Sequence, residues 1–284
     1  MIAFLGMGLL GSNFVRALRN RNVEVQVWNR TASKAKALEE VGAKAFESVA
    51  DAVKGAERIH IVVSDDAAVD AVLAEAAASF SPNVIIVDHT TTSASGAARR
   101  SKDFAAKGIR YIHAPVFMGP SNALEASGTM LISGDQDLVK ELTPELSQMT
   151  GSLMNLGSDP AKAAAFKLLG NHFLITLTGG IADTFALAKS LGVENEEVSN
   201  LFQVFNPGTS IPARVKRMLM ADYDNPTWEL SMARKDARLM IEEAHQSNIN
   251  LGVISAIAAG MDTLIADGHG GADWTIIAKD AITK

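Results

Sequence analysis

The chain has 284 residues, and 48% of them are hydrophobic, which is enough for a substantial core and excludes a disordered protein. Its formal net charge of −6 argues against a nucleic-acid partner, because such binding requires a basic face. There is no cysteine, so disulfides, thiolate zinc sites and cysteine nucleophiles are excluded.

The sequence has no feature of a membrane or secreted protein. No uninterrupted apolar run approaches the roughly 20 residues that a membrane span needs. The apolar start is too short for the core of a signal peptide, and it lacks a basic leader and a cleavage site. We therefore expect a cytoplasmic protein without a membrane partner, whose length suits one large domain or two smaller ones.

The first stretch of the chain reads as a strand, a turn and the start of a helix. Residues 2–5 form a short apolar run, and apolar residues at helical spacing continue to about residue 20. Between them lies the pattern Gly-x-Gly-x-x-Gly, made of Gly6, Met7, Gly8, Leu9, Leu10 and Gly11. In this pattern Gly6 allows the tight turn, Gly8 lets the backbone approach a pyrophosphate, and Gly11 lets the helix pack close to the strand. The helix N-terminus adds unpaired N–H groups for the phosphates, so the stretch predicts a dinucleotide site rather than a plain turn.

The second strand, residues 24–28, ends in Asn29, Arg30 and Thr31. An acidic residue at this place selects NAD, because it accepts hydrogen bonds from the ribose 2′-hydroxyl. This chain has no acid there, and Arg30 offers a planar cation suited to a 2′-phosphate, while Asn29 and Thr31 add neutral hydrogen-bonding groups. We therefore predict that the chain prefers NADP(H) to NAD(H). The alternative is that Arg30 is only a solvated charge in a loop.

A helix is expected over residues 33–41, and a third strand is expected over residues 58–63. Ser64 follows that strand. Loops at the carboxyl ends of strands line the cofactor crevice in a doubly wound sheet, so Ser64 is a candidate cofactor contact. Asp65 and Asp66 are expected to cap the next helix rather than to act in catalysis or bind a metal, and no metal site is predicted.

The fourth strand, residues 84–87, runs into a polar stretch at residues 88–93. The hydroxyls of residues 90–93 suit contacts with the nicotinamide ribose or a substrate. They also suit capping of the helix expected over residues 94–104, and both roles can hold at once. His89 is a candidate acid–base residue, although a structural role is the more common one for a lone histidine in such a place.

Residues 110–114 form another expected strand, followed by a loop marked by glycine and proline at 115–122. Further strands are expected at 130–133 and 153–156. Alternating strands and helices over about 155 residues indicate an α/β Rossmann domain, a doubly wound parallel sheet covered on both faces. We place this NADP-binding domain at residues 1–158.

The remainder, residues 159–284, is predicted to be an all-α domain for substrate binding and oligomerisation. Its first helix begins at Asp159 and Pro160, which supply an N-cap acceptor and a first-turn proline, and it continues to about residue 191. This helix is apolar on nearly all faces, so we expect it to be buried. Further helices are expected over residues 195–205, 211–220, 230–247 and 253–266, and from about residue 272.

Lys167 and Asn171 are the main candidates for chemistry. They stand four residues apart on the long helix and therefore share one face. A lysine within an apolar helix is costly unless it is paired or placed in a cavity, and desolvation lowers its pKa towards neutrality. Such a lysine can exchange a proton with an alcohol or carbonyl oxygen. The spacing leaves open the alternative that Lys167 reaches solvent with only its stem buried.

Lys235 and Asp236 are adjacent residues in the helix expected over 230–247. Neighbouring side chains on a helix point apart by about 100°, so the two cannot line one site equally. By themselves they are typical of ordinary surface charge.

The chain as a whole resembles the β-hydroxyacid dehydrogenase family, which includes 3-hydroxyisobutyrate dehydrogenase and tartronate semialdehyde reductase. The resemblance covers essentially the whole chain and rests on several motifs in the family's order. These motifs are the turn at residues 6–11, Asn29-Arg30-Thr31, residues 88–93, Ala114-Pro115-Val116, Gly128-Thr129-Met130, Lys167 to Asn171, and Lys235-Asp236.

The resemblance implies that Lys167 is the general acid–base group and that Asn171 is its neighbour at the substrate. It implies that Thr91 contacts the cofactor and that Lys235 reaches the cofactor or substrate from the α-domain. It also implies an NADP preference through Arg30. Family members form dimers or tetramers through the α-domain, so a homodimer or homotetramer is implied, which would explain so apolar a long helix.

One loop departs from the family pattern. A serine and paired glycines usually follow Ala-Pro-Val and hold the substrate carboxylate, whereas this chain has Phe117, Met118 and Gly119. Carboxylate binding is therefore in doubt, or it shifts to backbone amides and side chains around Gly119, Ser121 and Asn122. The glycine-rich run before the lysine is also altered. The chain thus resembles a divergent branch related to the imine reductases, which vary the same loop but usually lack the lysine.

These features predict an NADP-dependent oxidoreductase that moves a hydride between the nicotinamide and the carbonyl carbon of a small aldehyde or keto acid. The corresponding product is a hydroxy acid or alcohol. One alternative is reduction of a C=N bond on the same scaffold, which the apolar residues Phe117 and Met118 favour. Another is a non-catalytic module that senses NADP(H), and the retained Lys167 and Asn171 count against it.

Overall fold

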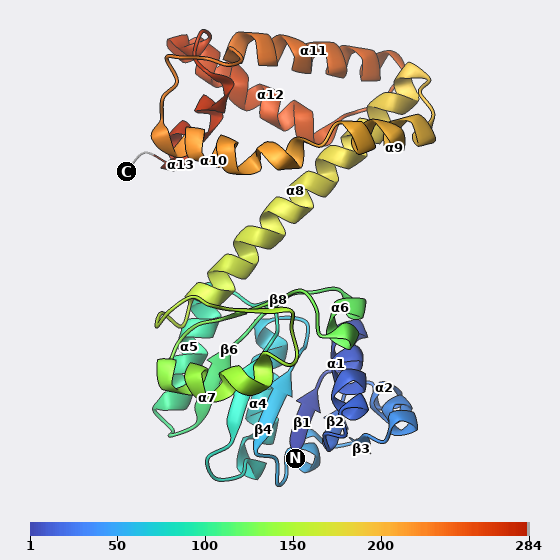
Figure 1. Cartoon of the computed structure of the whole chain (residues 1–284), viewed down its shortest axis with the longest axis vertical. Coiled ribbons are helices and arrows are strands. Elements are labelled where there is room, and N and C mark those ends of the chain that lie inside the picture. The colour runs from blue at the N-terminus through green and yellow to red at the C-terminus, as the bar shows by residue number, and fades with distance from the viewer. Residues whose placement is uncertain (283–284) are drawn as a thin grey trace. The chain divides into compact units, whose positions relative to one another are not determined.

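The structure, a computed structural model, describes residues 1–282 (Figure 1). The chain divides into two compact units, Met1–Asn171 and His172–Lys284. This division falls within the long helix α8, Lys162–Leu191. The domain boundary predicted at residue 158 precedes that helix and stays a prediction.

The first unit contains a six-stranded parallel sheet in the order β3-β2-β1-β4-β5-β6. Its central strand β1 pairs with β2 on one side and with β4 on the other, so Ile2 lies opposite both Val25 and Arg58. This arrangement confirms the predicted doubly wound fold. The strands are β1 (Ile2–Leu5), β2 (Val25–Trp28), β3 (Lys44–Phe46), β4 (Arg58–Ile61), β5 (Ile85–Asp88) and β6 (Arg110–His113).

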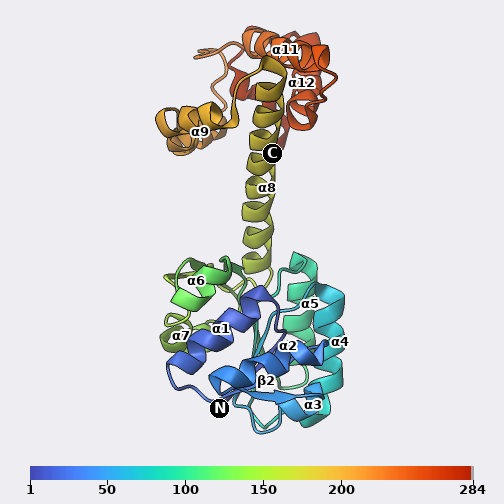
Figure 2. The ribbon, with the colours of Figure 1, turned by 90° about the vertical axis from the view of Figure 1, so that its right-hand side faces the viewer.

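Helices cover both faces of this sheet, and Figure 2 shows α1 on one side of it and α3, α4 and α5 on the other. Successive side chains of a strand point to opposite faces. On β1, Phe4 packs with Phe14 of α1 in one core, whereas Leu5 packs with Val69 of α4 in the other. The helices are α1 (Leu9–Asn20), α2 (Ala32–Lys36), α3 (Val49–Ala52), α4 (Asp66–Ala76), α5 (Ala94–Ala105), α6 (Pro120–Glu125) and α7 (Gln136–Leu146). Single 3-10 turns continue α2 and α4 over Ala37–Val41 and Ala77–Ser79.

The last three strands of this unit do not extend the parallel sheet, which corrects the expectation of one sheet over the whole domain. They form a second sheet in the order β7-β8-β9, in which β7 is antiparallel to β8. The chain leaves the first sheet after β6, where Pro115 has no backbone N–H to donate to a strand ladder. The three strands are β7 (Val116–Phe117), β8 (Thr129–Ile132) and β9 (Ser152–Asn155).

The second unit is helical, and among residues 160–282 the structure assigns no strand, as predicted. After α8 the α-helices are α9 (Asn195–Val204), α10 (Ile211–Met220), α11 (Leu230–Gln246), α12 (Gly252–Leu264) and α13 (Lys279–Ile282). Single 3-10 or π turns span Pro207–Ser210, Ile265–His269 and Trp274–Ala278. A small core forms around Leu230, Ala233, Met261 and Ile276.

Many side chains of the long helix α8 are exposed in the single chain, so the expectation that the helix is buried was wrong for the single chain. Side chains along it are markedly open to solvent, including Leu169 at 64% and Ile175 at 70%. An apolar sequence predicts that a helix needs a covering surface, but it does not say that the same chain supplies that surface. Over residues 1–282, no helix combines the length and apolarity that crossing a membrane requires.

Candidate active site and cofactor cleft

The glycine-rich turn has the geometry that a dinucleotide requires. Gly6 has a φ of +101°, and a Cβ atom there would lie 1.9 Å from the Val62 carbonyl oxygen. A Cβ atom on Gly11 would lie 2.0 Å from the Gly6 carbonyl oxygen, so α1 packs directly against the turn. Apart from Gly8 and its neighbours in the chain, no atom of the described residues lies within 4 Å of the place where a Cβ atom of Gly8 would be. This open space at the N-terminus of α1 fits a pyrophosphate.

Asn29 joins the turn to the end of β2. The backbone N–H of Met7 donates a hydrogen bond of 2.9 Å to Asn29 Oδ1, and Asn29 Nδ2 donates one of 3.0 Å to the Thr31 carbonyl. The side chain therefore fixes two loops relative to each other. Its role in this structure is to hold the walls of the site.

A cleft of about 570 Å³ lies against the turn, the end of β2 and the start of α4. Most of the predicted cofactor residues line it: Gly6, Gly8, Leu9, Leu10, Asn29, Arg30, Thr31 and Ser64. Met7 and Gly11 are buried and lie outside its lining, as does the exposed Thr91. The structure thus brings the glycine turn and the β2 loop into one concave surface.

Two cations of this cleft have no partner in the described chain. Arg30 and Lys34 are exposed residues of the lining, and within residues 1–282 neither side chain makes a hydrogen bond or an ion pair. Lys34 lies on α2, four residues after Arg30, and the sequence prediction missed it. A possible signal was its position in the first turn of the helix that follows the β2 loop, close in sequence to Arg30. Both cations are free to meet a phosphate.

The two aspartates after β4 have separate roles. Asp65 Oδ1 accepts a hydrogen bond of 2.8 Å from the Ala68 N–H and so caps α4, as predicted. This bond lowers the pKa of Asp65, and the Ser64 hydroxyl, which donates to Asp65 Oδ2, acts in the same direction. Asp66 instead reaches the next loop, where its Oδ2 accepts from the Ser93 N–H at 2.8 Å.

Some of the hydroxyls that follow β5 make hydrogen bonds within the protein, and one is exposed without a partner in the described chain. Thr90 Oγ1 accepts from the Val63 N–H at 3.1 Å, and Ser93 Oγ accepts from the Gly96 N–H at 3.0 Å and caps α5. Thr92 is buried, with its hydroxyl 3.3 Å from His113 Nε2. Within the described residues the Thr91 hydroxyl has no hydrogen-bond partner, and it is exposed. Capping is therefore confirmed for Ser93, and the cofactor contact of Thr91 stays a prediction.

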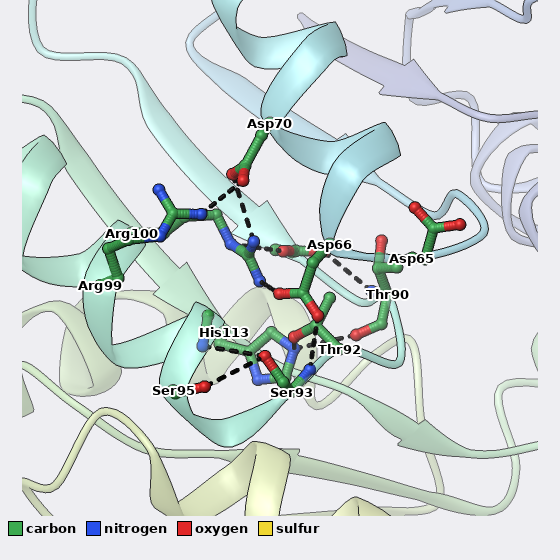
Figure 3. A network of polar contacts seen from close by, with 12 residues as sticks. Asp65, Asp66, Asp70, Thr90, Thr92, Ser93, Ser95, Arg99, Arg100 and His113 are labelled. Carbon is green, nitrogen blue, oxygen red and sulfur yellow. Dashed lines mark hydrogen bonds and ion pairs between the residues drawn. The ribbon is translucent and has the colours of Figure 1, made fainter.

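A buried arginine ties these loops together (Figure 3). The Arg100 side chain is only 1% exposed, and it donates to Asp66 Oδ1 at 2.7 Å, to Asp70 Oδ1 at 3.2 Å and to the Tyr111 hydroxyl at 3.2 Å. Tyr111 in turn donates to Asp88 Oδ2 at 2.7 Å. A buried charge requires such a full set of partners. The network fixes the loops after β4 and β5 at the carboxyl edge of the sheet.

His89 is a structural residue. It is 2% exposed, and its Nδ1 donates to the Ala114 carbonyl at 2.7 Å because a carbonyl can only accept. Its Nε2 therefore accepts from His60 Nδ1 at 2.8 Å, and His60 Nε2 accepts from Arg58 Nε at 2.9 Å. Burial lowers the pKa of His89 to about 4 and that of His60 well below its usual value. Both rings are neutral at physiological pH, and neither nitrogen of His89 is free for catalysis.

Lys167 and Asn171 meet as their spacing predicts. Lys167 Nζ donates a hydrogen bond of 2.9 Å to Asn171 Oδ1, and it also lies 4.5 Å from the centre of the Phe117 ring. The side chain is half-buried, and desolvation lowers the pKa of Lys167. The ammonium is thus held within a polar and aromatic setting. The alternative of a lysine that simply extends into water does not describe it.

The loop after β7 uses its polar groups within itself. The Gly119 N–H donates to Asn122 Oδ1 at 2.8 Å, and Asn122 Nδ2 donates to Ser127 Oγ at 2.9 Å. Ser121 is exposed, and Met118 packs against the core of the first unit. Gly119 and Asn122, two of the predicted substrate contacts, therefore close the loop on itself.

Lys235 lies on α11 in the second unit, where its Nζ is 2.8 Å from Asp236 Oδ1 in an exposed ion pair. The pair agrees with the surface interpretation of these residues, and the reach of Lys235 to cofactor or substrate stays a prediction. No cluster of three or more histidine, aspartate or glutamate side chains suited to a metal occurs in the part of the chain that the structure describes.

Residues 1–157, more than half of the chain, match the family described as the NAD binding domain of 6-phosphogluconate dehydrogenase. The chain belongs to this family. Beyond this NAD-binding part, residues 159–281 match the NADPH-dependent reductive aminase-like C-terminal domain. The two matches confirm the predicted resemblance to hydroxyacid dehydrogenases and to their imine-reductase relatives.

Relatives of this NAD-binding family align with nearly the whole chain. The "NADPH-dependent reductive aminase" of Aspergillus oryzae is 25% identical over 98% of this chain and 96% of its own. The "3-sulfolactaldehyde reductase" of Escherichia coli is 25% identical over 98% and 94%. The imine reductase of Myxococcus stipitatus, solved in complex with NADP+, has the same fold, with a TM-score of 0.92 at 21% identity over 98% of this chain and 99% of that one. The chain is therefore an oxidoreductase that uses a nicotinamide cofactor.

Proposed function

We propose that this chain is an NADP-dependent reductase of a small carbonyl compound, an aldehyde or keto acid, in which Lys167 exchanges the proton. The observation that carries the proposal is the Lys167–Asn171 pair, a half-buried ammonium hydrogen-bonded to an amide at 2.9 Å. It belongs to the same unit as a cleft whose turn fits a dinucleotide. No carboxylate within residues 1–282 pairs with Lys167, so its ammonium is available to a reacting oxygen.

The proton chemistry follows from the surroundings of Lys167. A bound nicotinamide would supply the hydride for reduction of the carbonyl carbon. Lys167 would then give a proton to the developing alkoxide, and it would take that proton back in the oxidative direction. Desolvation lowers the pKa of Lys167 and makes the ammonium a better acid. Asn171 Oδ1 holds the ammonium in place between turnovers.

The preference for NADP(H) rests on the charges of the cleft. Arg30 and Lys34 line it without partners in the described chain, and no acidic residue ends β2. A 2′-phosphate supplies the anion that two such cations bind, whereas a 2′-hydroxyl leaves them unused. The proposal therefore assigns the 2′-phosphate to this end of the cleft.

A second candidate is reduction of a C=N bond. Two observations favour it: Phe117 and Met118 replace the polar loop of the hydroxyacid dehydrogenases, and residues 159–281 match a reductive aminase-like domain. Assays with a cyclic imine beside the aldehydes decide between the two, because turnover of the imine alone would replace carbonyl reduction as the main activity.

The proposal is tested by Lys167→Ala, with Lys162→Ala as the matched control, since Lys162 is an exposed lysine of the same helix. Loss of a general acid costs about 10²- to 10⁴-fold in rate. We expect that loss in the kcat for NADPH oxidation with an aldehyde, an unchanged Kd for NADPH, and normal rates in the control. Normal turnover by Lys167→Ala would remove the lysine from the mechanism. Tight NADPH binding without turnover of any carbonyl or imine would favour a sensor.

We also propose that the chain self-associates through its helical part into a homodimer or homotetramer. Exposed apolar side chains occur along α8 and also on the later helices, where Val204 is 85% and Leu219 is 67% exposed. A helix with so many exposed apolar side chains is typical of a surface that a partner covers. Light scattering after size exclusion should give twice or four times the chain mass, and a monomer at micromolar concentration would contradict the proposal.

A further inference from the structure

The backbone that carries Phe117 is fixed on both sides. Phe117 pairs with Thr129 in the antiparallel ladder of β7 and β8. Gly128, just before β8, has a φ of +77°, and a Cβ atom there would lie 2.8 Å from the Phe117 carbonyl oxygen. The close contact leaves little freedom to the strand, so the direction of the Phe117 side chain is set by the second sheet.

The Phe117 ring rests on α8 at Gly170, where the helix has no side chain. A Cβ atom on Gly170 would lie 2.3 Å from Phe117 Cζ and 2.6 Å from Cε1, which no real contact allows. The ring therefore occupies the space that any other residue at position 170 would fill. In this position the centre of the Phe117 ring lies 4.5 Å from Lys167 Nζ, which is an attractive cation–π arrangement. Gly170 thus positions the ring, and the ring faces the ammonium.

The same surroundings offer little to a carboxylate. A carboxylate needs N–H or hydroxyl donors beside its positive partner. Within the loop, the Gly119 N–H is bonded to Asn122 Oδ1, Asn122 Nδ2 gives one N–H to Ser127 Oγ, and Pro120 has no N–H to donate. The face of an aromatic ring is electron-rich and repels an anion. A carboxylate beside Lys167 would also stabilise the ammonium and make it a weaker acid.

We propose that the substrate is a carbonyl compound whose remaining part is uncharged and apolar, and that this part lies on the Phe117 ring. This inference rests on the proposed function and narrows its substrate class. Phe117 is the specificity-determining residue, and Gly170 is a positioning residue that acts through it. Apolar surface of the substrate loses contact with water on the ring, which favours binding.

A matched pair of substrates tests the inference directly. 4-Oxobutanoate and its methyl ester share the aldehyde and the chain, and they differ in charge at the far end. We expect a kcat/KM at least tenfold higher for the ester with NADPH, and a similar value for pentanal and the ester. Phe117→Ser should reduce this preference at least fivefold. A wild-type preference for the acid would overturn the inference while leaving carbonyl reduction in place.

The contact between Phe117 and Gly170 is tested by a double-variant cycle. Gly170→Ala should lower kcat/KM for the ester at least tenfold, because the new methyl group displaces the ring. Gly180→Ala is the matched control on the same helix, since no atom lies within 4 Å of its Cβ position, and it should behave as wild type. Adding Phe117→Ala to Gly170→Ala should restore part of the ester's kcat. An additive cycle would show that residue 170 does not act through the Phe117 ring.

A binding measurement separates this inference from the proposed function. Titration calorimetry of the NADP+-saturated protein with methyl butanoate and with butanoate requires no turnover. Tighter binding of methyl butanoate, lost in Phe117→Ser, supports the inference even if no aldehyde is reduced, in which case the proposed function fails alone. Tighter binding of butanoate overturns the inference. A Phe117→Leu variant adds a second readout, because loss of the ring should move the Lys167 step in the pH–rate profile to lower pH.

Discussion

The glycine-rich turn and the surroundings of Lys167 lie in the same unit but are held in different ways. The turn is held by backbone contacts, with the carbonyl of Val62 against Gly6 and the carbonyl of Gly6 against Gly11. Lys167 is held by side chains, the Phe117 ring and the Asn171 amide. Backbone contacts cannot adapt to an added atom, whereas side-chain contacts can be exchanged. Changes at Gly6 and Gly11 should therefore affect folding and cofactor binding together, and changes near Lys167 should affect rate and specificity.

The largest effect is expected for Gly6→Ala. The new Cβ atom would meet the Val62 carbonyl oxygen at 1.9 Å, and the φ of +101° is strained for alanine. Strain and overpacking together should lower the free energy of unfolding by about 3 kcal/mol or more and abolish NADPH binding. Urea unfolding and fluorescence titration with NADPH measure the two effects.

Gly8→Ala is the control for the turn. Its Cβ atom has open space in the protein, so the free energy of unfolding should stay near the wild-type value. The same atom would stand where the pyrophosphate approaches, so NADPH binding should weaken at least tenfold. Equal destabilisation by the two variants would contradict the difference between the closed Cβ position of Gly6 and the open one of Gly8.

The next effect is a loss of folding stability at acid pH, which we expect from the buried His89. His89 holds the Ala114 carbonyl, and its pKa is about 4 in the folded protein against about 6.5 in an unfolded chain. Between these values the unfolded state binds more protons. The stability is therefore complete above about pH 6.5 and is lost as the pH falls towards 4, by about 3 kcal/mol for this group at about 1.4 kcal/mol per unit.

Urea unfolding at pH 7, 6 and 5 measures this loss. His89→Asn keeps a donor near the position of Nδ1 but cannot titrate, so it should reduce the slope of stability with pH. His60 retains its own contribution, because burial also lowers its pKa. The exposed His245, changed to Asn, is the matched control and should leave the slope unchanged. A wild-type slope in His89→Asn would show that the histidine pair does not control acid stability.

A smaller effect is expected at the cations of the cofactor cleft. Arg30→Ala and Lys34→Ala should each raise the KM for NADPH about tenfold, because each loses one charge-assisted contact of about 1.5 kcal/mol. The KM for NADH should not change. Lys36→Ala is the control, since Lys36 is an exposed lysine of the same helix outside the cleft lining. Equal losses with NADH would show that the two cations do not select the 2′-phosphate.

The features that the sequence could predict are those that depend on residues close together in the chain. The glycine turn and the Lys167–Asn171 pair depend on local spacing, and both could be found from the chain alone. The contact between Phe117 and Gly170 joins distant segments, and no pattern in the sequence places one against the other. The strand signals of β8 and β9 were found, but strand signals do not specify a pairing, so the second sheet was missed. The apolar composition of α8 could be seen in the sequence, whereas the exposure of many of its side chains could not.

The smallest effects are expected for the hydroxyls that follow β5, because one of them caps a helix and another has no partner in the described chain. Ser93 caps α5 through the Gly96 N–H, so Ser93→Ala should lower the free energy of unfolding by about 1 kcal/mol and leave the Kd for NADPH unchanged. Thr91 is exposed and has no partner in the described chain, so Thr91→Val should leave stability unchanged and raise the Kd for NADPH about threefold, by loss of one neutral hydrogen bond of about 0.6 kcal/mol. Urea unfolding and NADPH titration of both variants should show that Ser93→Ala changes only stability and that Thr91→Val changes only NADPH affinity. The opposite result, with Ser93→Ala weakening NADPH binding and Thr91→Val reducing stability, would show that neighbouring hydroxyls in this loop have exchanged the roles that their hydrogen bonds indicate.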